Sequence, residues 1–160
     1  MTGFLEAALR PPALRDYEAL TSWVPDAVAC ARWAGPGLRF PFRAKELPDL
    51  LAGSRSRSVC LGEPGGAALA FGQYWGKTNG AVHLGRIIVA PQARGRGVGR
   101  RFCELLVAAA LEDTAAAVVT LRVYRDNAVA LRLYSGLGFV PVDAEATADT
   151  LLMRQVARRL

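Results

Sequence analysis

The order of apolar and polar positions divides the chain into segments with helical and with strand-like patterns. Residues 4–9 are short and half apolar, which predicts a strand. Residues 13–34 carry apolar side chains at helical spacing, interrupted at Pro25 and followed by Asp26, a good helix N-cap. We therefore expect two short helices there. Residues 35–42 combine glycines and prolines with two aromatic residues and predict an ordered loop.

The next part of the chain alternates apolar runs with turn residues, a pattern typical of strands. Asn79-Gly80, a dipeptide that favours tight hairpins, separates two of these runs, so we expect antiparallel neighbours. The three expected strands are residues 56–61, 67–75 and 81–90, and a short helix near residues 44–51 precedes them.

The remaining residues return to a helical period and then to strands. Apolar residues fall on one stripe from residue 97 to 111, which predicts an amphipathic helix packed on the sheet. A central strand, a helix capped by Asp126-Asn127 and two final strands are expected at residues 116–124, 127–135, 139–142 and 150–156. This order predicts an α/β (α+β) fold in one domain, residues 1–160, with a mixed sheet flanked by about four helices.

The composition favours a packed globule, since 52% of the residues are hydrophobic and 21% are charged. No apolar run reaches the length of a membrane span and the first residues do not resemble a signal peptide, so we expect a cytoplasmic protein with no membrane partner. Cys30, Cys60 and Cys103 lack the spacing of zinc or redox motifs. We expect buried free thiols and no metal site.

The formal charge of +6 comes almost entirely from arginine, because Lys45 and Lys77 are the only lysines. Arginine binds phosphate through a planar fork, so this excess suits a phosphorylated cofactor or a nucleic acid, and it also favours solubility. The net charge alone does not distinguish between a phosphorylated cofactor, a nucleic acid and a role in solubility.

Residues 94–99, Arg-Gly-Arg-Gly-Val-Gly, lie between a buried strand end and the amphipathic helix. A helix N-terminus preceded by glycines is a natural phosphate site, although a tight turn with solvated arginines is the simpler alternative. A Rossmann fingerprint is excluded because the third glycine comes one position too early. Residues 76–78, Gly-Lys-Thr, are excluded as a Walker loop because Phe71 stands where glycine is required.

These residues resemble the GNAT superfamily of N-acetyltransferases in its bacterial form. Residues 94–99 match the family's pyrophosphate loop, Gln/Arg-x-x-Gly-x-Gly/Ala. Residues 127–139 are similar to its segment N-x-x-A-x-x-L-Y-x-x-x-G-F, and the resemblance covers residues 81–142. It implies a mostly antiparallel sheet with one splayed parallel pair, whose strands end at Val89 and Tyr124 and admit the pantetheine arm of acetyl-CoA.

The resemblance also implies which residues hold acetyl-CoA. The pyrophosphate would lie on the glycine-rich turn, the backbone of the preceding strand would hold the arm, and the last helix would face the cofactor. The implied cofactor-binding residues are Ile87, Ile88, Val89, Arg94, Gly95, Arg96, Gly97, Val98, Gly99, Arg100, Asn127 and Ala130.

Acetyl transfer to an amine needs a proton donor for the leaving thiolate and a route for the amine's own proton. Tyr134 follows Asn127 on the same helical face and is the candidate general acid, with an aromatic anchor as the alternative. Some family members have a glutamate five positions before Asn127, where this chain has Arg122. His83 is the candidate base, and ordered water is the favoured alternative.

We expect Trp33, Phe40, Phe42, Tyr74 and Tyr124 to form apolar or aromatic walls for the acceptor. The sequence thus predicts an acetyl-CoA-dependent N-acetyltransferase that acts by direct attack of a primary amine of a small molecule or peptide, as a monomer or homodimer. The missing carboxylate leaves an acyl-CoA sensor as an alternative. A nucleic-acid binder is less favoured, because the helix after the turn has apolar residues where base-reading side chains would be needed.

Overall fold

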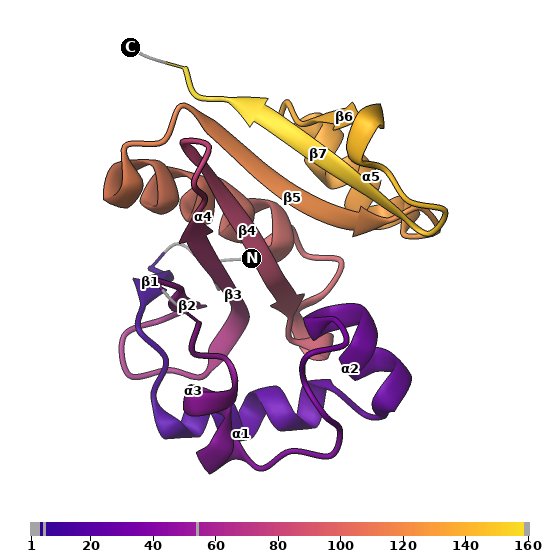
Figure 1. Cartoon of the computed structure of the whole chain (residues 1–160). Coiled ribbons are helices and arrows are strands. Elements are labelled where there is room, and N and C mark those ends of the chain that lie inside the picture. Colours follow the sequence, from indigo (N-terminus) through magenta and orange to yellow (C-terminus); the bar gives the residue numbers. More distant parts are fainter. Residues whose placement is uncertain (1–3, 5, 54, 159–160) are drawn as a thin grey trace.

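The computed structural model describes residues 4, 6–53 and 55–158 of the chain. The strands of this part form one sheet in the order β1-β2-β3-β4-β5-β7-β6, in which β4 and β5 are parallel and the other neighbours antiparallel (Figure 1). The strands are β1 (Ala8–Arg10), β2 (Arg57–Gly62), β3 (Ala68–Gly76), β4 (Ala81–Val89), β5 (Val118–Tyr124), β6 (Val140–Val142) and β7 (Thr150–Val156).

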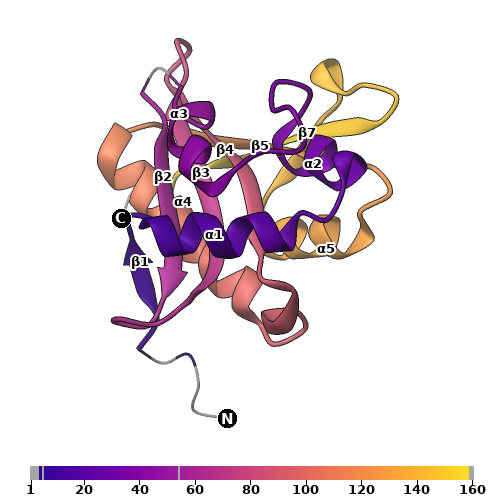
Figure 2. The same cartoon turned by 90° about the horizontal axis from the view of Figure 1, so that it is seen from below.

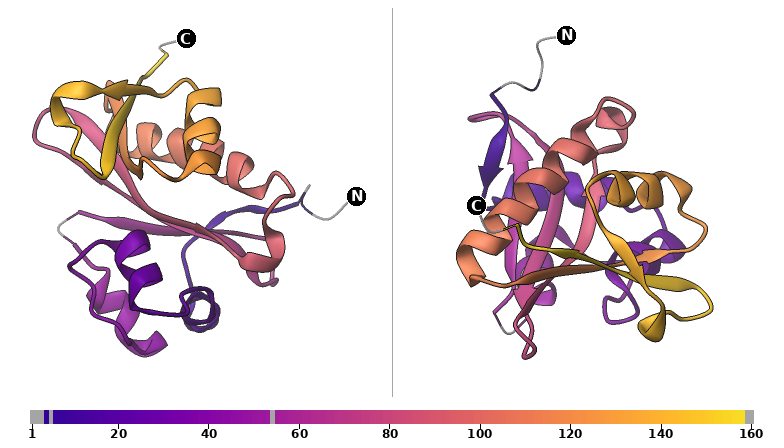
Figure 3. Two further views of the ribbon diagram at one scale, coloured as in Figure 1. Left: turned by 90° about the vertical axis from the view of Figure 1, so that its right-hand side faces the viewer. Right: turned by 90° about the horizontal axis from the view of Figure 1, so that it is seen from above.

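Helices cover both faces of this sheet (Figures 2 and 3). The N-terminal helices lie on one face, and the two later helices lie on the other (Figure 3). The helices are α1 (Leu14–Trp23), α2 (Ala27–Ala34), α3 (Leu47–Leu50), α4 (Val98–Thr114) and α5 (Ala128–Gly136), with 3-10 turns at Ala44–Glu46, Pro91–Ala93 and Asp143–Glu145. The predicted mixed sheet with one parallel pair is confirmed.

Local signals explain several of these boundaries. Helix α2 begins after Asp26, whose carboxylate accepts a hydrogen bond from the Ala29 N–H at 2.8 Å. The β3–β4 connection turns at Gly80, which has a φ of 79°, a conformation that glycine adopts without strain. The two helices and the hairpin predicted at these positions are therefore confirmed.

The core has one layer on each side of the sheet. On the N-terminal face, the ring of Phe71 in β3 lies 6.2 Å from Tyr17 of α1 and 6.1 Å from Trp33 of α2. On the opposite face, a side chain at Gly72 would lie within 3.0 Å of the Phe102 ring, so glycine allows α4 to pack directly on β3. The two layers bury the centre of the sheet on both faces.

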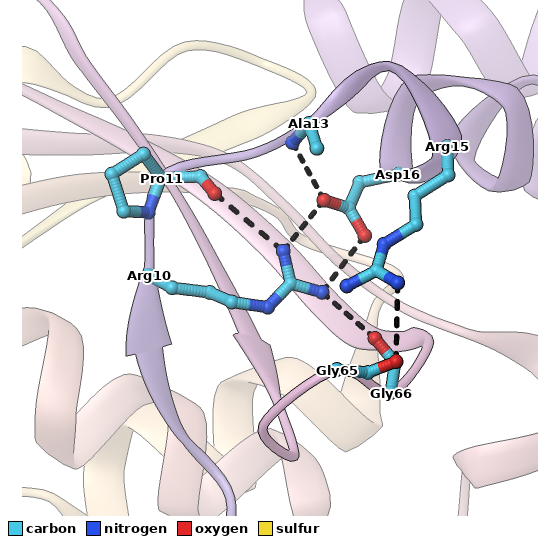
Figure 4. Close-up of polar contacts among 7 residues, drawn as sticks. All are labelled: Arg10, Pro11, Ala13, Arg15, Asp16, Gly65 and Gly66. Atoms are coloured by element: carbon cyan, nitrogen blue, oxygen red, sulfur yellow. Dashed lines mark hydrogen bonds and ion pairs between the residues drawn. The ribbon is translucent and has the colours of Figure 1, made fainter.

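A buried ion pair fixes the start of α1 (Figure 4). The Arg10 guanidinium donates to both carboxylate oxygens of Asp16, at 2.6 and 2.9 Å, and to the Gly66 carbonyl at 3.1 Å. The same carboxylate accepts the Ala13 N–H at 2.7 Å, which satisfies a free donor at the helix N-terminus. One side-chain cluster thus joins β1, α1 and the β2–β3 turn.

Cys30, Cys60 and Cys103 are free and buried, as predicted. Burial raises the pKa of Cys60 and Cys103 to about 12, so these thiols are inert near neutral pH. Among the described residues, no helix combines the length and the apolar character needed to cross a membrane.

Candidate active site

The parallel strands β4 and β5 are paired over only part of their length. Residue pairing runs from Ala81 with Val118 to Leu84 with Leu121. Beyond these pairs, the C-terminal ends of the two strands diverge (Figure 1). The facing edges of the diverging segments are therefore available to a ligand.

A β-bulge in β4 coincides with the start of this divergence. Phe71 of β3 pairs with Ile88, and Gln73 pairs with Gly85, so Arg86 and Ile87 together lie opposite one residue of β3. Arg86 has a φ of 51°, a left-handed conformation that is uncommon outside glycine. The indole N–H of Trp33 donates to the Arg86 carbonyl at 2.8 Å and ties α2 to the bulge.

Two adjacent pockets lie at the opening. The smaller has a volume of about 100 Å³ and lies between β4, β5, α2 and α5. The larger, about 570 Å³, extends to the α1–α2 junction and to Arg94 of the glycine-rich turn. Their shared walls are Arg32, Trp33, Ile87, Tyr124 and Asn127. We call these two pockets together the cleft.

The glycine-rich turn joins the end of β4 to α4. Gly95 and Gly97 have φ values of 73° and 79°, and no heavy atom lies within 4 Å of the position that a Cβ would occupy at either residue. The helical hydrogen bonds begin with Arg101, whose N–H donates to Gly97. The N–H groups of the residues between them have no acceptor within the helix, so they and the open space over the glycines form an anion cradle.

The arginines of the turn have different surroundings. Arg94 lines the larger pocket and donates to the Val89 carbonyl at 3.1 Å. The guanidinium of Arg96 lies 4.7 Å from the Phe4 ring centroid. Arg100 pairs with Glu104 at 3.2 Å, on the side of a separate hollow near α5. The turn is thus strongly basic, while its backbone rather than one arginine forms the cradle.

Helix α5 brings three predicted residues to the cleft. Asn127, its N-cap, accepts the Ala130 N–H at 3.2 Å, and both residues line the smaller pocket. Tyr134 lines the same pocket and is only 8% exposed. Burial, together with the nearby Cys103, raises the pKa of Tyr134 above its usual value. The phenol therefore remains protonated near neutral pH.

His83 lies in the paired part of β4, and it does not line the cleft. Its Nδ1 is 2.8 Å from the Thr120 hydroxyl, and the Trp75 ring covers it at 5.0 Å. Burial, with smaller contributions from the charges of Lys77 and Arg122, lowers the pKa of His83 to about 4. The structure does not bring this predicted residue to the other site residues.

The five predicted aromatic wall residues lie in four different places. Trp33 and Tyr124 line both pockets. Phe42 packs against Trp33 at 6.4 Å and lines neither pocket, while Phe40 lines a different hollow beside α3. Tyr74 faces the C-terminal end of α4, outside both pockets, and its hydroxyl donates to Asp113 there at 3.2 Å. The structure therefore does not bring Tyr74 to the cleft.

Sequence reasoning missed the charged walls of the smaller pocket, which are Arg32, Arg86 and Arg122. The sequence indicated Arg122 only as the residue that stands where some family members have a glutamate. The bulge that places Arg86 has no reliable local signal, since its only sequence mark is the adjacent Gly85. In the described residues, no group of three or more His, Cys, Asp or Glu side chains could hold a metal ion.

A splayed parallel pair beside a glycine-rich helix N-terminus defines a site for an extended ligand with a phosphate group at one end. The sequence model of the acetyltransferase (GNAT) family matches residues 27–139. The chain belongs to this family. It is accordingly an N-acetyltransferase by class, and acetyl-CoA is the usual cofactor of the family.

Solved structures have the same fold. Spermidine N-acetyltransferase from Vibrio cholerae, in complex with CoA and spermine, is 16% identical, with a TM-score of 0.76 and coverage of 94% of this chain and 95% of the other. Ribosomal-protein-S18-alanine N-acetyltransferase from Escherichia coli is 23% identical, with a TM-score of 0.66 and coverage of 94% and 93%. PaiA N-acetyltransferase from Thermoplasma acidophilum, in complex with coenzyme A, is 14% identical, with a TM-score of 0.71 and coverage of 96% and 100%.

Proposed function

We propose that this protein transfers the acetyl group of acetyl-CoA to a primary amine of a small molecule or peptide by direct attack, with Tyr134 as general acid. The observation that carries the proposal is the position of the buried, protonated Tyr134 in a pocket between the diverging strands. That pocket continues to the turn that can hold a pyrophosphate. We also propose that residues 1–160 form a single domain, since every described strand joins one sheet.

The described residues fit acetyl-CoA along this path. The open positions over Gly95 and Gly97, with the backbone N–H groups of Val98 to Arg100, would hold the pyrophosphate. The backbone of Ile87 to Val89 would hold the pantetheine arm, with Asn127 and Ala130 on the facing helix. When bound, acetyl-CoA supplies a thioester carbonyl as electrophile and a thiolate as leaving group.

The reaction then requires two proton movements. The lone pair of the neutral amine forms the new C–N bond as the C–S bond breaks. The Tyr134 hydroxyl gives its proton to the departing sulfur, and solvent restores that proton. The amine nitrogen loses its own proton to water, because Asp and Glu are absent from the described residues that line the cleft.

A thiol-release assay with acetyl-CoA tests the proposed function directly. The acceptors should include amino acids, peptides with a free N-terminus or lysine, polyamines and aminoglycosides. We expect release of one CoA thiol for each amine acetylated, confirmed by mass spectrometry of the product. If calorimetry shows that the protein binds acetyl-CoA but none of these amines is acetylated, the acyl-CoA sensor alternative is favoured instead.

Substitution of Gly97 by alanine is expected to weaken the binding of acetyl-CoA about tenfold. The new methyl group occupies the open side of the cradle, where the pyrophosphate would lie, and alanine also costs about 1–2 kcal/mol whenever the turn adopts the left-handed conformation that forms the cradle. Calorimetric titration measures the effect. Gly65→Ala is a matched control, because Gly65 has a similar φ of 70° and open surroundings but lies in the β2–β3 turn. Equal losses in both variants would contradict the assignment of the cradle.

Substitution of His83 by glutamine is expected to leave the shape of the pH profile of kcat/KM unchanged. His83 is buried outside the cleft and, with its pKa lowered to about 4, it is neutral over the working range of the enzyme. Initial rates between about pH 6 and pH 9.5 provide the comparison. The loss of an acidic limb in the variant would instead identify His83 as the base and would contradict the role of water.

A further inference from the structure

Arg86 is a charged residue that lines the smaller pocket of the cleft and has a neutral partner. Its guanidinium donates to the Gln73 side-chain oxygen at 2.6 Å, and none of the ion pairs among the described residues includes it. Burial lowers the pKa of Arg86, which reflects the cost of keeping this cation half-buried. A half-buried guanidinium with only a neutral partner is a strong binding group for an anion.

Gln73 holds this guanidinium in a fixed position. The Gln73 side chain is fully buried, and its amide nitrogen donates to the Leu51 carbonyl at 2.9 Å and to the Ser58 hydroxyl at 2.8 Å. These two bonds turn the amide oxygen toward Arg86. A guanidinium has five N–H donors, so several remain for a ligand after the bond to Gln73.

The other charges at the smaller pocket have the same sign. Arg32 lies against the Tyr124 ring and is paired with Asp126 at 2.6 Å, while Arg122 donates to the Glu145 carbonyl and lies 3.9 Å from its carboxylate. Neither carboxylate lines the pocket, and no other acidic residue of the described chain does so. Arg32 and Arg122 are thus partly compensated by their carboxylates, whereas the charge of Arg86 is not, and a polycationic acceptor would meet this uncompensated cation in a partly buried site.

We propose that the acceptor amine carries a carboxylate and that Arg86 binds this carboxylate beside Tyr134. The planar fork of arginine matches a carboxylate in a bidentate arrangement, which orients the ligand as well as attracting it. The inference rests on the proposed transferase function, and Arg86 acts in it as a specificity-determining residue rather than as a catalytic one.

The activity test compares amino acids with their carboxamides, such as glutamate, methionine and glycine with the matching amides. The carboxylate raises the pKa of the neighbouring amine, which by itself favours the amide. We nevertheless expect a kcat/KM at least about tenfold higher for the carboxylate than for the amide. Spermidine should be a poor acceptor. A preference for the amide, for spermidine or for phosphoethanolamine would overturn the proposal.

Variants of Arg86 test whether this residue causes the preference for carboxylate acceptors. In Arg86→Gln, the ratio of kcat/KM for the carboxylate to kcat/KM for the amide should fall about tenfold, mainly because KM for the carboxylate rises. Arg86→Lys should keep only part of the wild-type ratio. Arg39→Gln removes the same charge from an exposed site in the hollow beside α3 and should keep the ratio. An unchanged ratio in Arg86→Gln would overturn the proposal.

A binding experiment separates this inference from the proposed function. Calorimetric titration of the CoA-loaded protein with an N-acetylated amino acid should show binding that weakens about tenfold in Arg86→Gln, while the affinity for CoA itself is retained. If no amine is acetylated and this binding persists, the transferase assignment fails and the carboxylate site remains. If amines are acetylated without carboxylate binding, the carboxylate site fails and the transferase remains.

Discussion

Substitution of Tyr134 by phenylalanine is expected to lower kcat about 100-fold or more, with little change in the affinity for acetyl-CoA. A positioned general acid contributes about 10²- to 10⁴-fold to a rate. The variant keeps the ring that packs against Phe139 at 6.0 Å and removes only the hydroxyl at the pocket. Steady-state thiol release measures kcat, and calorimetry with acetyl-CoA shows whether the cofactor site is intact.

The matched control for this experiment is Tyr74→Phe. Tyr74 is similarly buried, but its hydroxyl donates to Asp113 of α4 and lies outside both pockets, so its loss should leave kcat close to that of the wild type. Because the pKa of Tyr134 is raised, we also expect no fall in rate from ionisation of this phenol up to about pH 10. Unchanged turnover in Tyr134→Phe with normal cofactor binding would leave Tyr134 as an aromatic anchor only.

Substitution of Asp16 by alanine is expected to lower the free energy of unfolding by about 3 kcal/mol. Removal of one partner of a buried ion pair typically costs about 3–5 kcal/mol, and we expect the lower end because the Arg10 side chain is 22% exposed. The change leaves the guanidinium without its carboxylate and the Ala13 N–H without its acceptor (Figure 4). Urea denaturation followed by circular dichroism measures the loss.

Asp26→Ala serves as the control for this stability experiment. Asp26 also accepts an N–H at the start of a helix, but it is exposed, so its loss should cost clearly less than that of Asp16. If the two variants were destabilised equally, the Arg10–Asp16 pair would contribute no more than an ordinary helix cap.

The contribution of Asp16 should disappear in acid. Burial raises the pKa of this carboxyl, but the hydrogen bonds from Arg10 and Ala13 lower it more, so the pKa in the folded protein lies below its usual value. A carboxyl with a lowered folded pKa adds stability above its unfolded pKa of about 3.9, and this stability is lost as the pH falls through the folded value. The difference between wild type and Asp16→Ala should therefore be full at pH 7 and shrink below about pH 4. A difference independent of pH would contradict a role for the ionised carboxylate.

Much of the fold could be predicted because its signals are local. The break at Pro25, the cap at Asp26, the hairpin at Gly80 and the helical stripe after residue 97 each depend on a few neighbouring residues. The spacing of Asn127 and Tyr134 fixes them on one helical face in any context. The glycine-rich turn and the segment from Asn127 to Phe139 carried the family resemblance, which the match of the family model to residues 27–139 confirms.

The lining of the cleft could not be predicted in the same way. Tyr74 lies outside the cleft because β3 contributes no lining residue to either pocket, and the smaller pocket opens between β4 and β5. The aromatic type of Tyr74 gave no information about its distance from that opening. His83 likewise occupies the paired part of β4, and only the register with β5 showed where pairing ends.

By itself, the sequence determined the order of elements, the glycine-rich anion cradle and the helix that carries Tyr134, because each arises from residues close together in the chain. Only the tertiary structure decided the charge of the smaller pocket. Arg32, Arg86 and Arg122 come from α2, β4 and β5, and they meet because of a bulge and the strand register. Such long-range geometry depends on the packing of the whole sheet, and no local pattern of residues encodes it.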